Sequence, residues 1–323
     1  MLAIPGLSAL GKMGKTMIDP QLQKLLSAMY EAGFPRIGTV PIQQLRAFSR
    51  PMPATTEVGN IENILIPAND RTIGARLYRN NSITTGLIVY FHGGGWVFGS
   101  LDSVDAALRI LASETNFAIL SIDYRLAPEN PFPAAVHDAL DAYEWAANNR
   151  AALTGAPDCP LLVMGDSAGG NLAAVVAQQA RLAGDTRITQ QILIYPAVDG
   201  NIEALRSQKM DPPFMKLDEM IWIFDQYVAP EHRRDPRVAP ALTQDLSGLP
   251  PTVVVTAEYD LLTAEGIRYA ARLREAGVVV TELHYEGGVH GFFTFAPMFE
   301  IGKRALNDVA RVIRATSEAS AAS

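Results

Sequence analysis

Two glycine-rich strings, each placed directly after a short apolar run, limit what this chain can fold into more than any other feature. The string HGGGW at 92–96 follows the apolar run 87–91, and the string GDSAGG at 165–170 follows the run 161–164. The second string holds the pattern G-x-S-x-G between a strand-like run and a helical pattern. At such a junction the pattern is typical of a sharp turn that exposes its serine, because glycines on both sides leave room for the tight backbone. We therefore expect Ser167 to lie on a strand-to-helix turn.

Beyond about residue 57, strand-like and helical patterns alternate along the chain. Short buried runs that alternate with helices indicate an α/β fold with a mainly parallel sheet covered on both faces. The expected strands are 61–66, 72–78, 87–91, 117–122, 161–164, 192–195, 252–256 and 278–285, and the expected helices lie near 102–115, 133–149, 169–183, 263–276 and 300–316.

Two segments fall outside this alternation. Residues 1 to about 50 are predicted to be helical, with Asp19 as N-cap, Pro20 at the first helical position and Gly33 just past the end of that helix. The segment 201–235 is rich in Met, Phe and Trp and is interpreted as an insertion over the sheet edge. Met and aromatic side chains occur both in ordinary packing and in pocket walls. The segment can therefore either pack on the domain or form a wall of the acyl pocket, and the sequence leaves both alternatives open.

Charge and motif content exclude several function classes. The formal net charge of −7 and the lack of a basic run argue against nucleic acid and anionic membrane surfaces as partners. Neither G-x-G-x-x-G nor G-x-x-x-x-G-K-S/T occurs at the two glycine-rich loops, so no nucleotide site is expected there. No apolar run approaches the roughly 18 residues of a membrane span, and no signal peptide is recognised, so we expect a cytoplasmic protein. The single cysteine, Cys159, is interpreted as a buried spectator.

A serine hydroxyl is a weak nucleophile and needs a base that a third group orients, here expected after Ser167 in the chain. His232 lies in a charged stretch and is expected on the surface, and His284 lies in an alternating run and is expected in a strand. His290 lies in a glycine-containing loop just past the last expected strand, where a catalytic side chain of a parallel sheet belongs. His290 is therefore the candidate base.

Three carboxylates follow the strand expected at 252–256 and compete for the role of orienting acid. Asp260 lies in a loop beyond that strand, whereas Glu258 can still belong to the strand end. Glu265 is expected to open the next helix, where its charge suits the helix N-terminus. Position favours Asp260 and leaves Glu258 and Glu265 as alternatives.

These strings, with three further ones, resemble the hormone-sensitive-lipase-type esterases of the α/β-hydrolase superfamily. The further strings are DYRLAPE at 123–129, YDLL at 259–262 and HGF at 290–292, and the match runs in order from about residue 60 to 316. Leu261 departs from the family, which usually has proline after the acid; this departure loosens the loop but leaves the acid in place.

The resemblance implies the architecture of an α/β-hydrolase fold, with an eight-stranded, mostly parallel sheet flanked by helices. It also implies a helical cap on the catalytic domain. The cap would be built from segments 1–50 and 201–235, and the catalytic domain from segments 51–200 and 236–323. Many members of the family dimerise through the last strand, so a homodimer of that kind is a further expectation.

For single residues, the resemblance implies Ser167 as the nucleophile, His290 as general base and then general acid, and Asp260 as the orienting acid, with no cofactor and no metal. Asp166 is the common residue before the nucleophile and is interpreted as structural. The expected oxyanion hole consists of the backbone N–H groups of Gly94, Gly95, Ala168 and Gly93. The candidate lining of the substrate pocket comprises Phe98, Phe214, Met215 and Trp222.

The function that this resemblance implies is that of a carboxylesterase acting on small-molecule esters with short to medium acyl chains. A second class of function on the same fold is a small-molecule receptor, as in the plant gibberellin receptors, which have lost the catalytic histidine. Because His290 is present here with Ser167 and Asp260, the sequence favours the enzyme. An amidase or a thioesterase remains an alternative, since the same constellation serves all acyl transfers.

Overall fold

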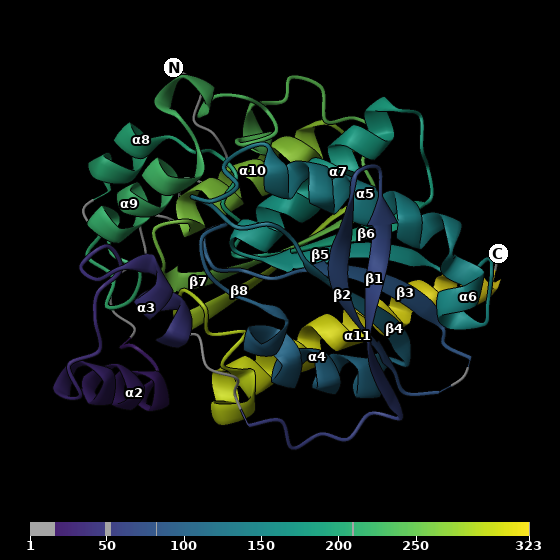
Figure 1. Cartoon of the computed structure of the whole chain (residues 1–323), viewed down its shortest axis with the longest axis horizontal. Coiled ribbons are helices and arrows are strands. Elements are labelled where there is room, and N and C mark those ends of the chain that lie inside the picture. Colours follow the sequence, from purple (N-terminus) through teal and green to yellow (C-terminus); the bar gives the residue numbers. More distant parts are fainter. Residues whose placement is uncertain (1–16, 49–52, 82, 209, 323) are drawn as a thin grey trace.

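One mixed sheet forms the centre of the structure (Figure 1). The computed structural model describes residues 17–48, 53–81, 83–208 and 210–322. The strands lie in the order β1-β2-β4-β3-β5-β6-β7-β8, with β2 antiparallel to β1 and β4 and all later neighbours parallel. The predicted eight-stranded, mostly parallel sheet is thus confirmed. The strands are β1 (Asn60–Ala68), β2 (Arg71–Arg79), β3 (Gly86–Phe91), β4 (Phe117–Asp123), β5 (Leu161–Asp166), β6 (Ile188–Ile194), β7 (Thr252–Tyr259) and β8 (Val280–Val289).

Helices cover both faces of the sheet, with α4 and α11 on one face and α5, α7 and α10 on the other (Figure 1). Successive side chains of a strand point to opposite faces. Accordingly Leu87, Val89 and Phe91 of β3 enter one hydrophobic core, and Ile88 and Tyr90 enter the other. These helices are α4 (Leu101–Thr115), α5 (Ala134–Asn148), α7 (Ala168–Leu182), α10 (Thr263–Glu275) and α11 (Glu300–Ala322).

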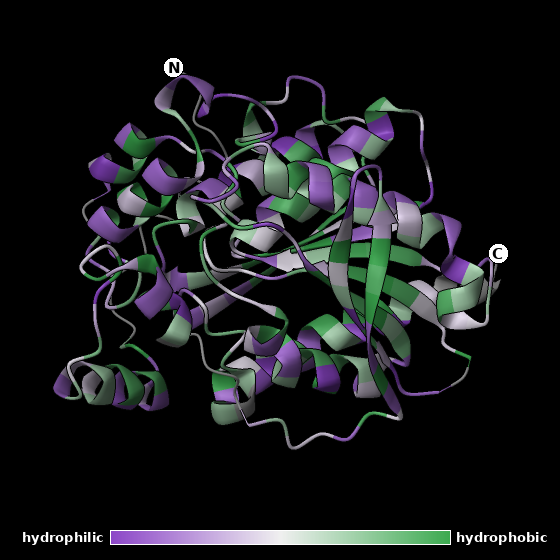
Figure 2. Ribbon diagram, viewed as in Figure 1, coloured by the Kyte–Doolittle hydropathy of each residue, from purple (hydrophilic) through white to green (hydrophobic). Residues whose placement is uncertain are grey.

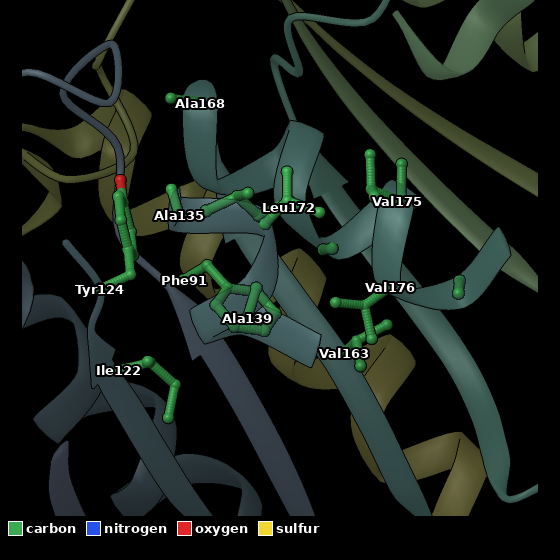
Figure 3. Close-up of a cluster of buried hydrophobic side chains, with 14 of the residues drawn as sticks. Phe91, Ile122, Tyr124, Ala135, Ala139, Val163, Ala168, Leu172, Val175 and Val176 are labelled. Carbon is green, nitrogen blue, oxygen red and sulfur yellow. The ribbon is translucent and has the colours of Figure 1, made fainter. Parts of the chain in front are cut away.

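The core between the sheet and α7 fixes the turn that carries the serine. Phe91 of β3 and Val163 of β5 belong to the same buried cluster as Leu172 and Val176 of α7 (Figure 3). Figure 2 shows the inner strands mostly in hydrophobic colours and the helices with mixed faces, as burial on both sides of a parallel sheet requires. Because β5 and α7 are both anchored in this core, Ser167 between them has little freedom.

The segments that precede and interrupt the alternating pattern gather at one end of the sheet, on the left of Figure 1. The predicted helix start is confirmed, since Asp19 Oδ1 accepts hydrogen bonds from the N–H groups of Gln21 and Leu22, and Gly33 follows the helix end with φ 65°. These helices are α2 (Pro20–Glu31), α3 (Ile42–Phe48), α8 (Ile202–Ser207) and α9 (Leu217–Tyr227). Residues 1–16, part of the expected N-terminal helical segment, lie outside the described residues.

The link between α2 and α3 is tied to α9. Arg36 forms an ion pair with Asp218 at 2.6 Å, and Glu219 accepts the N–H of Ile37 at 3.2 Å. A Cβ built on Gly38 would lie 3.0 Å from the ring of Trp222. The two segments that sequence patterns set apart, distant along the chain, therefore pack on each other.

The structure also departs from the sequence expectations. β8 extends to Val289, so Gly287 and Gly288 belong to the strand and not to a loop. The short helix α6 (Arg150–Thr154) was not expected, because one turn is too short for a periodic pattern. Cys159 is half-buried rather than buried, with its thiol near the hydroxyl of Thr154. Short 3-10 helices occur at Pro230–His232, Pro240–Leu242 and Ala296–Met298.

None of the described helices is both long enough and apolar enough to cross a membrane.

Candidate active site

Ser167 occupies a strained turn between β5 and α7. Its φ of 56° and ψ of −117° fall in a region that residues with a side chain rarely adopt. A Cβ on Gly165 would lie 2.3 Å from the backbone of Gly169, and a Cβ on Gly169 would lie 1.9 Å from the carbonyl oxygen of Phe91. Only glycine fits at these two positions, which explains physically why the pattern G-x-S-x-G surrounds this serine.

The structure brings Ser167, His290 and Asp260 together from three separate strand ends. His290 Nε2 lies 2.9 Å from Ser167 Oγ, and His290 Nδ1 lies 2.7 Å from Asp260 Oδ2. The other oxygen of Asp260 accepts the N–H of Leu262 at 2.9 Å, which fixes the carboxylate. With its proton on Nδ1, the imidazole presents a lone pair at Nε2 to the serine hydroxyl. This is the geometry of a serine nucleophile, its base and an orienting acid.

Burial and charge act in opposite directions on His290, which is 3% exposed. Burial lowers the pKa of the imidazole, whereas the negative charge of Asp260, its hydrogen bond and the charge of Asp166 raise it. The net result is a pKa above the ordinary value for histidine. The site therefore favours the imidazolium that forms when the base takes a proton.

The two alternative acids make different contacts. Glu258 accepts the N–H of Gly287 at 2.8 Å. Glu265 accepts the N–H groups of Val198 at 2.6 Å and Asp199 at 3.2 Å. Both carboxylates are buried and accept backbone N–H groups, whereas Asp260 accepts the hydrogen bond that the Nδ1–H of His290 donates.

The other two histidines after the serine also lie away from this site. His284 is exposed on β8, where Nδ1 lies 2.9 Å from the hydroxyl of Thr256. His232 is exposed, as its charged surroundings predict.

The HGGGW loop is shaped by contacts that exclude side chains. Gly94 has φ 112° and Gly95 has φ 61°. A Cβ on Gly94 would lie 2.0 Å from the carbonyl oxygen of Phe98, and one on Gly95 would lie 2.5 Å from a methyl carbon of Ile223. Within the described residues, the N–H groups of Gly94 and Gly95 have no hydrogen-bond acceptor. The Ala168 N–H lies in the first turn of α7, where no intrahelical acceptor exists.

Gly93 differs from its neighbours. Its N–H donates to Asp166 Oδ1 at 2.8 Å, so this group is already used and does not offer a donor to a substrate. A Cβ on Gly93 would lie 2.3 Å from Asp166 Oδ2, so the loop and the turn that carries Ser167 are in direct contact. The expected oxyanion donors thus reduce to those of Gly94, Gly95 and Ala168.

Asp166 is a buried carboxylate that links these two parts of the site. It accepts the phenol O–H of Tyr90 at 2.7 Å as well as the N–H of Gly93. Burial raises the pKa of Asp166 to about 6, although both hydrogen bonds act to lower it. The interpretation of Asp166 as structural agrees with these contacts.

Helix α9 lies directly on the HGGGW loop. The indole ring of Trp96 stacks on the phenol ring of Tyr227, with centroids 4.2 Å apart and planes within 5°. Phe224 packs on the same indole at 5.6 Å, and Ile223 covers Gly95. Helix α9, within the segment 201–235, therefore covers the HGGGW loop.

The four candidate pocket residues contact different parts of the chain. Phe214 lies near the loop after the histidine, 3.6 Å from a Cβ placed on Gly291, and pairs edge-on with Phe295 at 6.2 Å. Trp222 packs on Gly38, and Met215 is buried with φ 57°. Phe98 is half-buried behind Gly94, to whose carbonyl its N–H donates at 2.9 Å.

Sequence reasoning missed Arg46 of α3, which contacts the end of the HGGGW loop. Its Nε donates to the carbonyl of Val97 at 2.9 Å, and one terminal nitrogen donates to the carbonyl of Ala127 at 2.8 Å. The guanidinium also forms a bidentate pair with Glu129. No local pattern marks such a residue, because its partners are distant in sequence.

The part of the chain that the structure describes holds no group of three or more His, Cys, Asp or Glu side chains arranged to bind a metal ion. Its chemistry is that of a buried Ser–His–Asp chain beside unpaired backbone N–H groups.

Comparison with known proteins places this site among related ones. A family model described as an alpha/beta hydrolase fold matches residues 88–294. A protein named carboxylic ester hydrolase LipN, from Mycobacterium tuberculosis, is 37% identical over 299 residues, covering 88% of this chain and 78% of the relative. Esterase LipI from the same species is 34% identical, covering 91% of this chain and 93% of the relative.

A solved structure titled as a hyperthermophilic esterase from the archaeon Pyrobaculum calidifontis superposes with a TM-score of 0.86 at 36% identity. The alignment covers 93% of this chain and 99% of the other. The likeness therefore extends over nearly the full length of both proteins.

Proposed function

Because the chain belongs to the α/β-hydrolase family of the hormone-sensitive-lipase type, we propose that it is a serine carboxylesterase acting on esters with short to medium acyl chains. The single observation that carries the proposal is the hydrogen-bonded chain from Ser167 through His290 to Asp260, at 2.9 and 2.7 Å. The relatives named carboxylic ester hydrolase and esterase support the same reaction.

The first half of the mechanism is acylation of Ser167. His290 Nε2 takes the hydroxyl proton while Ser167 Oγ attacks the ester carbonyl carbon. The resulting imidazolium keeps its Nδ1–H on Asp260, which stabilises the charge and holds the ring in place. His290 then gives the proton from Nε2 to the leaving alkoxide, and the alcohol departs.

The second half is hydrolysis of the acyl-enzyme. A water molecule loses its proton to His290 and attacks the same carbonyl carbon. Collapse of the second tetrahedral intermediate returns the proton to Ser167 Oγ and releases the carboxylic acid. The site starts and ends in the same protonation state, so the reaction needs no group from outside the chain except water.

Backbone N–H groups stabilise the oxyanion in both halves. The proposed donors are those of Gly94 and Gly95 in the HGGGW loop and of Ala168 at the first turn of α7. A helix N-terminus also carries a partial positive charge that favours an anion. Losing one such donor typically costs about 10²–10³ in rate, so the loop conformation is central to activity.

The receptor alternative is disfavoured by a specific observation. A binding protein on this fold has no need of a base held between serine and acid, yet His290 is fully engaged with both partners here. The amidase and thioesterase alternatives use the same residues and differ only in the bond that is broken.

We also propose the division of the chain and its assembly. The catalytic domain comprises segments 51–200 and 236–323, and segments 1–50 and 201–235 form the cap. Contacts of Arg36 with Asp218 and of Ile223 with Gly95 support this division. β8 lies at the edge of the sheet, which supports a homodimer formed through that strand; sedimentation velocity would test it.

The proposed activity is tested by steady-state hydrolysis of p-nitrophenyl esters from acetate to palmitate, with wild type and Ser167→Ala side by side. Turnover should be greatest at short or medium acyl length and absent in the variant, whose circular dichroism should match wild type. Turnover that survives in Ser167→Ala would contradict the proposal, and so would folded wild-type protein that cleaves none of the esters.

A further inference from the structure

Tyr195, the residue directly after β6, packs against the ring of His290, whereas Ser167 and Asp260 contact only its two nitrogens. Its ring centroid lies 4.8 Å from that of His290, with the two ring planes tilted by 53°. Tyr195 thus limits the movement of His290 in a direction that hydrogen bonds alone leave free.

Tyr195 is held in a conformation that its own backbone disfavours. Its φ is 33°, which is rare for a residue with a large side chain. Its N–H donates to the carbonyl of Val255 at 2.7 Å, and Phe292 packs against its ring at 5.8 Å. Such strain persists only where the surroundings enforce it, and it is concentrated at functional sites.

The same short segment also holds the nucleophile. The N–H of Ser167 donates to the carbonyl of Ile194 at 2.8 Å, and the N–H of Ala197 donates to the carbonyl of Ser167 at 3.3 Å. Segment 194–197 therefore contacts both members of the serine–histidine pair. Its position fixes how far the hydroxyl lies from the base.

We propose that Tyr195 is a positioning residue, which keeps the His290 ring aligned with Ser167 and stabilises the imidazolium through its aromatic face. This inference rests on the proposed function, because the imidazolium forms when Ser167 attacks a carbonyl. A cation within about 6 Å of an aromatic centroid is attracted to the ring, more strongly when water is excluded. His290 is buried, so water does not solvate its charged form.

The contributions of other groups to the charge on His290 are separable from that of Tyr195. The charged groups acting on the ring are Asp260 at Nδ1 and Asp166 at the end of β5. The buried hydroxyl of Tyr195 interacts with Thr294, whereas the two nitrogens of His290 are engaged by Asp260 and Ser167. The ring rather than the hydroxyl therefore carries the effect, and Tyr195→Phe is a matched control for Tyr195→Leu.

The test is an NMR titration of the His290 imidazole, together with the pH profile of kcat/KM for p-nitrophenyl acetate. Tyr195→Leu should lower the pKa of His290 by about 0.5–1 unit, the size of a desolvated cation–π contact. It should reduce kcat about tenfold with little change in KM. Tyr195→Phe should leave both quantities close to wild type. An unchanged pKa in Tyr195→Leu, or equal shifts in both variants, would overturn the proposal.

A second series avoids any doubt about folding of the leucine variant. Phenylalanines with one, two and three ring fluorines at position 195 keep the shape of the ring and weaken its negative face. The pKa of His290 should fall stepwise along the series, and a constant pKa overturns the proposal. Because the titration needs no substrate, it decides the role of Tyr195 separately from whether wild type cleaves esters.

Discussion

At Ser167, local strain and tertiary packing meet in one residue. The positive φ there is tolerated because Gly165 and Gly169 allow backbone atoms to approach where any Cβ would collide. Those glycines are visible in the sequence, which is why the strand-to-helix turn at Ser167 could be predicted without a structure. The turn requires residues without a Cβ on both sides of the serine, so the residue types alone indicate it.

The residue pattern alone reduced the candidates for the orienting acid to three carboxylates but did not decide among them. The strand expected to end at 256 runs to Tyr259, so Asp260 follows it immediately and Glu258 lies within it. Side chains two residues apart in a strand point to the same face, so alternation alone does not separate these two carboxylates. They differ because the strand ends between them, with Glu258 inside β7 and Asp260 just beyond it. Arg46 and Tyr195 could not be found at all, because their roles exist only through contacts with distant residues.

Replacement of Asp260 by Asn separates the orienting acid from its neighbour. Asp260→Asn should lower kcat by about 10⁴-fold, because an amide does not hold the imidazole in the required tautomer. Glu258→Gln should stay within about tenfold of wild type, since an amide oxygen still accepts the N–H of Gly287. Rates with p-nitrophenyl butyrate decide the matter. A Glu258→Gln variant more damaged than Asp260→Asn would reassign the acid.

The raised pKa of His290 predicts where activity fails on acidification. The base must be neutral to accept the serine proton, so kcat/KM should fall as the pH drops through this pKa and reach a plateau above it. Since Asp260 and Asp166 outweigh burial and raise the pKa, the midpoint should lie above about 6.5, the ordinary value for histidine. A pH profile of kcat/KM measures it. A midpoint well below that value would mean that burial dominates instead.

At the scale of elements, the interior of each strand and helix was easier to predict than its ends. β3 and β5 are recognisable because both faces are buried and each contains a continuous apolar run, at 87–91 and 161–164, whereas the end of β8 runs through glycines that resemble a loop. Strand ends are set by pairing with β7, where a bulge separates Ala257 from Tyr259. The end of β8 depends on its hydrogen bonds with β7, so the residues of β8 alone do not predict it.

Helix α3 is predicted to hold the oxyanion loop through Arg46. Arg46→Ala removes the donors to the carbonyls of Val97 and Ala127, which should loosen the loop and lower kcat about tenfold, because small displacements of a catalytic group are costly. Glu129→Gln is the matched control, since it removes the ion pair and leaves the backbone contacts. Equal losses in the two variants would show that the ion pair, not the loop contact, matters.

At the scale of the whole molecule, a buried carboxylate should make stability depend on pH. Burial raises the pKa of Glu265 to about 8, although the N–H groups of Val198 and Asp199 act to lower it. Between the unfolded value of about 4.3 and this folded value, the native state binds the extra proton. The free energy of unfolding should therefore fall as the pH rises through that interval, with this contribution lost above the folded pKa.

Glu265→Gln tests this linkage, since its amide oxygen can still accept both N–H groups. At about pH 5 the variant and wild type should melt together, whereas near pH 8.5 the variant should melt higher by about 2–4 °C for each kcal/mol recovered. Scanning calorimetry at the two pH values gives the comparison. A difference in Tm that does not change with pH would show that Glu265 keeps the same protonation state throughout.

The account as a whole depends on Ser167 forming a covalent intermediate, and covalent trapping tests this most directly. Wild type would be treated with a p-nitrophenyl alkylphosphonate, and the modified peptide identified by mass spectrometry. The account predicts one phosphonyl group per chain, on Ser167, together with loss of esterase activity and greatly slowed labelling in His290→Gln. Labelling at any other residue, or full inactivation with Ser167 unmodified, would contradict it.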